Sequence, residues 1–510
     1  MASSSRTAST RSIPDKFPQP LDRWAILLMA VLSLVIVLLL WGGDRTAPRV
    51  REFSWQDKQI GSEDAAFILT FNRPMDQASV EANLRIEPKL DGKTSWAGRR
   101  MAYTLTNPAP YGTSFKVELQ GARDRFTQAA QRATIQPFNA QFRSRDRAFA
   151  YIGVTGEEAG RLILYNLSQQ QKLVLTPKDL VVLEFEPYPL GDRILFAATQ
   201  RTATPQGLLE QQLYTVTTGI HIDPPAQLDG KDESTYIPSK DPATKVELVL
   251  DSKDYQNLKF DLSADGQIIV VQRVNRKDPA DFGPWLIKAG SPPQALKGEP
   301  GGDFLIAPDS QSLAISQGQG LAILPLQPNA KPLDFLPKFG TVLNFSRDGS
   351  LATMVKFNTD RTRSLFLVSN QGTQKELLRT TGSILNAQFD PNKQVLYCLL
   401  TELITTGDIY REEPYLAAIE LKSEKLIPLV MLPDQRDVQV SLAPDGLAIL
   451  FDQTSEAAQE TETSGEQIRN NAGKVIADSR LWVLPLEGGI NTKPQPEPLP
   501  LPGLRPRWLP

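Results

Sequence analysis

The chain has 510 residues, of which 41% are hydrophobic and 22% charged, with a formal net charge of −3 and a single cysteine. This length exceeds one ordinary hydrophobic core, so we expect two or more folded units. The slightly acidic balance argues against a nucleic-acid partner, which needs a basic surface, and one cysteine excludes an intramolecular disulfide framework.

The first 43 residues predict a tail and a membrane anchor. Residues 1–23 are rich in Ser, Thr and Pro, which indicates a disordered tail. Within residues 24–43, the uncharged apolar run from Trp24 to Trp41 would span roughly 27 Å as a helix, close to the hydrocarbon thickness of a bilayer. A cleaved signal peptide is the alternative, but no A-x-A cleavage site follows the run. We therefore expect a single-pass transmembrane helix.

The charges on either side of this segment do not predict which of its ends faces the cytoplasm. Four basic residues precede the run and four follow it up to Lys58, so the positive-inside comparison is a tie. From the domains that follow, we expect a cytoplasmic N-terminus and an extracytoplasmic C-terminal body on the periplasmic or cell-surface side.

Residues 48–145 predict a small β-sandwich. Strand-like segments at 65–71, 101–106 and 114–119 are separated by turns that contain Pro and Gly. Alternate residues of the third segment are apolar, as a half-buried strand requires. Several strands at this spacing are typical of a sandwich.

The same segment resembles the bacterial Ig-like domains typified by the S-layer protein SbsA. The resemblance rests on F-x-x-P-M-D at 71–76, RIEP at 85–88 and YGTSFKVEL at 111–119, in the order of that family. The usual closing D-x-x-G-N turn is altered, with only Asp124 retained. In that family the domain is usually a spacer or adhesion module on exported proteins, which supports the orientation chosen above.

Residues 147–510 repeat a strand, a tight turn and a second strand. Six such repeats are visible, at 181–198, 258–271, 303–316, 342–355, 385–399 and 438–451. Repeats of 40–50 residues with several strands each are typical of a β-propeller. The Asp-Gly pairs within them suit turns that need positive φ. Calcium binding is the alternative, but each turn supplies only one carboxylate.

A seventh repeat is split between the two ends of this region. Segments 148–154, 160–167 and 172–177 lack an inner strand, which the C-terminal LRPRWLP (504–510) can supply, and this join would close the ring. The repeat resembles TolB-type and WD40-like propellers. We expect an all-β protein: a transmembrane helix, an Ig-like β-sandwich, and a seven-bladed β-propeller closed by the C-terminal strand. An eighth blade within 219–256 is the alternative.

Few residues point to catalysis. His221 is the only histidine, which argues against a multi-histidine zinc site and a Ser-His-Asp triad, and Cys398 lies in an apolar strand. No G-x-S-x-G, dinucleotide or phosphate-loop motif occurs. We expect no enzymatic activity, no cofactor and no metal.

Long connections between second and third strands indicate a binding face of the propeller. They lie at 199–212, 273–284, 401–414 and 454–480. Loops on a rigid scaffold commonly carry binding, so Phe282, Trp285 and Tyr410 are candidate anchors for a partner, although such loops can also be merely tolerated.

The sequence therefore predicts a membrane-anchored, non-catalytic scaffold for protein–protein interaction in the cell envelope. One alternative is a glycan- or peptidoglycan-binding module that uses the central channel or the Ig-like domain. A hydrolase is a third alternative, and it would need clustered acids in the channel.

Overall fold

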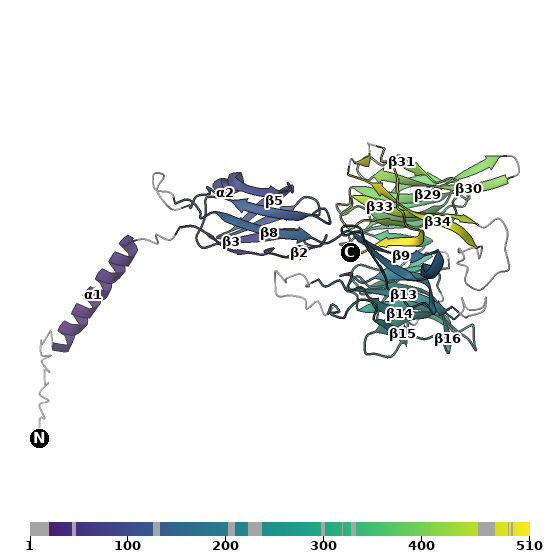
Figure 1. Cartoon of the computed structure of the whole chain (residues 1–510), viewed down its shortest axis with the longest axis horizontal. Helices are drawn as coiled ribbons and strands as arrows, with labels where there is room; N and C mark the ends of the chain where they lie inside the picture. Colours follow the sequence, from purple (N-terminus) through teal and green to yellow (C-terminus); the bar gives the residue numbers. More distant parts are fainter. Residues whose placement is uncertain are drawn as a thin grey trace, which may run out of the picture.

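The computed structural model describes residues 20–42, 47–125, 133–201, 210–222, 237–296, 301–318, 320–327, 333–406, 409–456, 475–487, 489–490 and 493–510. Residues 1–19 of the predicted tail lie outside this set. Figure 1 shows a helix, a narrow β domain and a wider group of sheets, which follow one another along the chain.

The predicted transmembrane anchor is wrong. Helix α1 (Pro20–Gly42) forms there, but its side chains are described only from residue 23 to residue 37. Within the described residues, no helix has the length and apolarity needed to cross a membrane. The predicted membrane localisation with an extracytoplasmic C-terminal body depended on this anchor, so that prediction is wrong as well.

The segment between residues 50 and 144 forms two four-stranded sheets. Sheet order is β1-β3-β6-β5 in one and β2-β8-β7-β4 in the other. The strands are β1 (Val50–Phe53), β2 (Gln59–Ile60), β3 (Ala66–Phe71), β4 (Leu84–Glu87), β5 (Gly92–Ala97), β6 (Arg100–Leu105), β7 (Ser114–Leu119) and β8 (Phe138–Ser144). Helix α2 (Gln77–Asn83) connects β3 to β4, and the Asp76 carboxylate accepts a hydrogen bond from Ser79 N at its start.

One apolar core lies between these two sheets. Phe67, Phe71 and Phe115 are almost fully buried there, because alternate residues of each strand point inward. Phe115 stacks on Phe142 at 5.0 Å between ring centroids. The segment is therefore a β-sandwich, as predicted, and we refer to residues 48–145 as the sandwich.

The described residues from 148 onward form seven four-stranded sheets. Their strands, sheet by sheet, are β12 (Leu180–Pro187), β13 (Arg193–Gln200), β14 (Gln212–Thr217) and β15 (Val246–Leu250); β16 (Tyr255–Leu262), β17 (Ile268–Asn275), β18 (Phe282–Lys288) and β19 (Gln294–Ala295); β20 (Phe304–Ile306), β21 (Ser312–Gln317), β22 (Gly320–Pro325) and β23 (Asp334–Leu336); β24 (Thr341–Phe345), β25 (Leu351–Phe357), β26 (Arg363–Ser369) and β27 (Gln374–Thr380); β28 (Ile384–Phe389), β29 (Val395–Thr406), β30 (Ile409–Glu420) and β31 (Lys425–Met431); β32 (Val440–Leu442), β33 (Ala448–Glu456), β34 (Ile476–Pro485) and β35 (Glu497–Pro498); and β9 (Ala148–Gly153), β10 (Leu162–Asn166), β11 (Gln171–Val174) and β36 (Gly503–Trp508).

The last of these sheets joins the two ends of the region. Its order is β11-β10-β9-β36, and β36 pairs antiparallel with β9, with Trp508 opposite Phe149. The predicted C-terminal closing strand is thus confirmed. In its described part, the segment considered for an eighth blade supplies β15, the fourth strand of the first sheet, and the first two residues of β16.

Seven apolar clusters among the described residues link these sheets into a ring. Each cluster contains residues of sheets that follow one another around the ring. The sheet of β9 packs on the first sheet through Ala150 and Phe196 and on the sixth through Tyr151 and Leu450. A sheet that is apolar on both faces cannot shield itself alone, so the sheets stack radially as a β-propeller.

Candidate functional site

A central channel of about 640 Å³ runs between the innermost strands. Every sheet lines it, through β12, β16, β20, β24, β28, β32 and β36 or the residues beside them. Its polar side chains include Glu184, Glu186, Lys259, Asp261, Asn344, Asn386, Gln388, Gln439, Arg505 and Arg507. Since all seven blades converge on it, this channel is a site that only the closed ring can build.

The charges in the channel balance one another. Arg507 forms an ion pair with Glu186, and Lys259 Nζ lies 3.0 Å from Asp303 Oδ1. Asp261 accepts hydrogen bonds from Ile306 N at 2.6 Å and Leu262 N at 3.0 Å. Burial nevertheless raises the pKa of Asp261 to about 6, because desolvation outweighs those two bonds. The channel therefore favours neither a strongly acidic nor a strongly basic ligand.

A bulge in the closing strand places Arg505 in the channel wall. Register between β36 and β9 shifts between Leu504 and Arg507, and Arg505 has a φ of +50°. The buried Asp452 carboxylate holds this bend by accepting Arg505 N and Gln439 N, both at 2.7 Å. Desolvation raises the pKa of Asp452 to about 6. A left-handed non-glycine residue costs free energy, and such residues concentrate at functional sites.

Gln388 joins two blades at the channel wall. Its amide nitrogen donates to Val440 O at 2.9 Å, and its amide oxygen accepts from Leu442 N at 2.8 Å. One side chain of the fifth blade thus forms two hydrogen bonds with the backbone of β32 in the sixth blade. The next pair of blades is joined in a similar way, because Ser441 Oγ of β32 accepts a hydrogen bond from Trp508 N of β36 at 3.1 Å.

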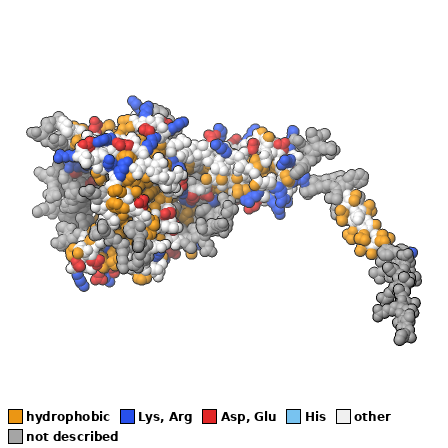
Figure 2. Space-filling model, turned by 180° about the vertical axis from the view of Figure 1, so that it is seen from behind, with side chains coloured by type: hydrophobic (Ala, Val, Ile, Leu, Met, Phe, Trp, Pro, Cys, Tyr) orange, Lys and Arg blue, Asp and Glu red, His pale blue; other side chains and the backbone are white. Residues whose placement is uncertain are grey.

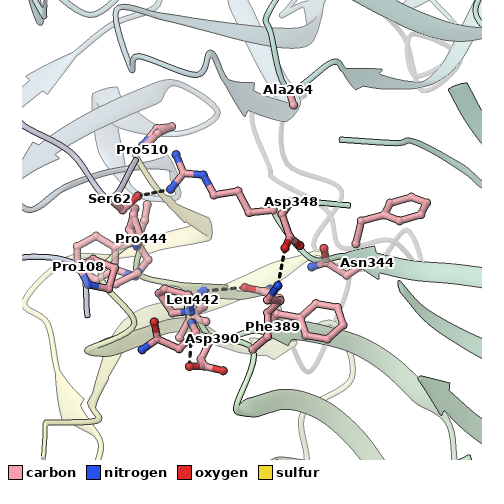
Figure 3. Close-up of a pocket in the computed structure, with 18 of the residues that line it drawn as sticks. Ser62, Pro108, Ala264, Asn344, Asp348, Phe389, Asp390, Leu442, Pro444 and Pro510 are labelled. Carbon is pink, nitrogen blue, oxygen red and sulfur yellow. Dashed lines mark hydrogen bonds and ion pairs between the residues drawn. The ribbon is translucent and has the colours of Figure 1, made fainter. Parts of the chain in front are cut away.

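The channel opens into a cleft of about 760 Å³ between propeller and sandwich. One wall belongs to the sandwich and includes Ser62 and Pro108, while the other includes Asn344, Phe389 and Pro444 of the propeller. Figure 3 shows Ser62 and Pro108 on one side of this space, with Asn344, Asp348 and Phe389 across from them. Asn344, Gln388 and Trp508 are among the residues that line both cavities, so cleft and channel form one passage.

The repeated Asp-Gly turns stand on the sandwich side of the propeller. Gly266, Gly349 and Gly446 have φ of +69°, +67° and +75°, which confirms the predicted turn chemistry. The aspartate before each glycine accepts a backbone N–H two residues ahead, as in Asp445 Oδ1 with Leu447 N at 3.1 Å. Since adjacent strands are antiparallel, the connections from second to third strands lie on the opposite face.

The three predicted anchors are not brought together. Phe282 and Trp285 lie on β18 of the second sheet, and because they are three residues apart on a strand they point to opposite faces of it. Tyr410 lies on β30 of the fifth sheet, and its side chain is outside the described residues. Trp285 packs on Tyr255 at 4.8 Å, with Arg273 over its ring at 5.0 Å.

The residues considered for catalysis lie apart from the channel. Cys398 is buried between the fourth and fifth sheets, where desolvation raises the pKa of its thiol and disfavours the reactive thiolate. His221 is exposed in the connection after β14. The described residues contain no group of three or more His, Cys, Asp or Glu side chains that could hold a metal ion.

The similarity of the chain to known proteins is confined to solved structures. No protein-family model matches it, including any for the SbsA-type domain, and no curated protein does. TolB from Acinetobacter baumannii aligns at 10% identity and a TM-score of 0.39, over 84% of this chain and 83% of that one. A putative 6-phosphogluconolactonase from Bacteroides fragilis aligns at 10% identity and 0.41, over 71% and 97%.

A third structure, prolyl oligopeptidase B from Galerina marginata, aligns at 7% identity and a TM-score of 0.41, over 83% of this chain and 51% of that one. TolB-like propellers are thus among the structures that this chain resembles. The other two structures bear the names of enzymes. At these scores the likeness carries no argument about ligand or activity.

Proposed function

We propose that the protein is a non-catalytic scaffold that binds a protein partner, with an extended segment of the partner in the cleft and channel. The single observation that carries this proposal is the set of carboxamide side chains on three consecutive blades. Asn344, Asn386 and Gln439 line the channel on these blades, while the carboxamide of Gln388 between them is already bonded to β32. A carboxamide both donates and accepts hydrogen bonds, as a peptide group does, so a row of them suits an extended backbone.

The size and charge of the passage support the same proposal. Cavities of about 640 and 760 Å³ lie within the range that binds ligands of several hundred daltons. Balanced charges in the channel suit a neutral backbone rather than a polyanion. On the face that Figure 2 shows, acidic and basic side chains are likewise interspersed over both domains. The mouth adds apolar contacts from Pro108, Phe389 and Pro444 for the side chains of such a segment.

A glycan or peptidoglycan fragment is the second candidate ligand. The guanidinium–carboxylate pair of Arg507 and Glu186 favours it, because these planar groups offer adjacent donors and acceptors to vicinal hydroxyls. Both candidates use the same passage, so the choice between them is one of ligand chemistry.

Peptide selection on the purified protein tests the proposal. We expect a displayed library of unstructured peptides to yield binders whose affinity falls at least about tenfold, or 1.4 kcal/mol, in the Asn344→Ala/Gln439→Ala double variant. Gln371→Ala, which removes an exposed carboxamide outside the cleft, should leave the affinity unchanged. Binding of soluble peptidoglycan fragments but of no peptide would favour the glycan, and equal affinity in all variants would contradict the proposed site.

Phe282, Trp285 and Tyr410 stay predictions as anchors for parts of the partner that lie outside the passage. Phe282 and Trp285 point to opposite faces of β18, and Tyr410 lies on β30 of another sheet, so each would have to contact the partner independently.

A further inference from the structure

The sandwich and the propeller have separate apolar cores. The core around Phe67 and Phe115 contains residues from Val50 to Phe142 only. Each of the clusters in the propeller contains residues from Ala148 onward. Among the described residues, no apolar cluster crosses the boundary, so hydrophobic packing does not fix one domain on the other.

Polar contacts hold the sandwich on the propeller instead. Asp445 Oδ2 accepts a hydrogen bond from Tyr111 N at 3.0 Å. Arg347 Nη1 donates to Ser62 Oγ at 2.8 Å, and its other terminal nitrogen lies 3.6 Å from Glu63 Oε2. Asn392 Nδ2 of the fifth blade also donates to Asn107 Oδ1 of the sandwich. These contacts come from the turns of the fourth, fifth and sixth blades, around the cleft.

The contact of Asp445 is the strongest of the set. Its side chain is 1% exposed, and it also lies 3.5 Å from Arg147 Nη2. A buried charged acceptor makes a stronger hydrogen bond than a neutral one. The side chain of Arg347 is 64% exposed, and exposed ion pairs contribute little. Loss of the Asp445 contact should therefore free the sandwich.

The chain connection confines such a movement to one residue. Residues 145–147 join β8 to β9, and Arg145 N donates to Ile60 O of the sandwich while Arg147 O accepts from Leu167 N of the propeller, which leaves Asp146 between them. Small, polar interfaces between domains allow relative motion unless a large apolar contact prevents it. Rotation about this short connection would move Ser62 and Pro108 away from the propeller wall of the cleft.

We propose that the sandwich is a hinged lid over the channel mouth and that Asp445 is its latch. With the latch engaged, the sandwich forms one wall of the cleft and restricts entry. With it released, the mouth opens to larger ligands. This proposal rests on the proposed function only because it takes the cleft as the partner site. Both tests below use the full chain without a partner.

A distance measurement tests the hinge. Spin labels at Arg100→Cys and Gln371→Cys report the separation of sandwich and propeller, since the native Cys398 is buried. We expect one narrow distance in this background and a second, longer distance after Asp445→Ala, which removes the acceptor. Asp265→Ala is the matched control, because Asp265 caps an equivalent turn by accepting Gln267 N at 3.0 Å. An unchanged narrow distance in Asp445→Ala would overturn the hinge.

Access to the channel tests the lid. A cysteine in place of Asn344 is alkylated either by N-ethylmaleimide or by a polyethylene-glycol maleimide. We expect the bulky reagent to react at least about fivefold faster in Asp445→Ala than in Asp265→Ala, while the rate of the small reagent is the same in both. Equal rates for the bulky reagent in both variants would overturn the lid. Peptide binding can fail while this result holds, so the two proposals are tested separately.

Discussion

The carboxylate of Asp445 lies 3.0 Å from the backbone nitrogen of Tyr111, 334 residues away in the sequence. Asp445 belongs to a turn of the sixth blade, whereas Tyr111 precedes β7 of the sandwich. The same side chain caps its own turn through Leu447 N. One aspartate of a repeated motif thus shapes a hairpin and also docks a second domain on the channel mouth.

The glycine of this turn should be sensitive to substitution. A Cβ at Gly446 would lie 2.7 Å from Pro391 Cδ, and its φ is +75°. Gly372 has a φ of +83°, but a Cβ added there would meet nothing within 4 Å, so Gly372→Ala isolates the backbone contribution. We expect Gly446→Ala to lower the free energy of unfolding by about 1–3 kcal/mol more than Gly372→Ala, measured in urea. Equal losses would contradict the close approach.

The closing strand should contribute strongly to stability. Trp508 is 6% exposed and packs edge-on against Phe149 of β9 at 5.6 Å. Trp508→Ala should cost about 3–5 kcal/mol of unfolding free energy in urea. Trp285→Ala, at a half-buried position on β18, should cost less. A loss at Trp508 no larger than that at Trp285 would show that β36 does not hold the ring closed.

Stability should depend on pH through Asp452. Its pKa is raised to about 6 in the folded chain by desolvation. Between about pH 4 and pH 6 the folded chain holds this proton while the unfolded chain releases it, so stability falls as pH rises. We expect the parent protein to lose about 2 kcal/mol more than Asp452→Asn over this window, from urea unfolding at both pH values. Parallel pH profiles would contradict the raised pKa.

Gln388 should matter for stability, in contrast to its neighbour Gln439. Gln388→Ala removes both hydrogen bonds to β32 and should cost about 1–3 kcal/mol of unfolding free energy. Gln439→Ala truncates a carboxamide of the same channel and should change stability by less than about 0.5 kcal/mol. Thermal or urea unfolding distinguishes them, and a similar loss for both would contradict the clamp between blades.

Much of the propeller could be predicted from the sequence because its turns and strands have local signatures. The strand pairs at 258–271 and 438–451 became the first two strands of their sheets, and LRPRWLP supplied the closing strand. The membrane anchor could not be predicted correctly from such a local pattern. Its apolar run predicted a crossing, but among the residues that the structure describes no helix has the length and apolarity to cross a membrane.

The channel could not be predicted, because bulges change which side chains face inward. Alternation along a strand fixes inward residues only while the register is regular. The register shifts between Val342 and Asn344 in β24 and between Ile384 and Asn386 in β28. The carboxamides at Asn344 and Asn386 therefore enter the channel through irregularities that no periodic pattern shows. The docking role of Asp445 is equally hidden, since Asp265 has the same local motif.

Site-specific photo-crosslinking tests the central claim most directly, by asking which face holds the partner. A photoreactive amino acid replaces either Asn344 in the cleft or Trp285 on β18, and each protein is irradiated with a selected peptide. We expect crosslinks from position 344 and none from position 285. Crosslinks from position 285 alone would place binding outside the cleft and contradict a partner site at the channel mouth.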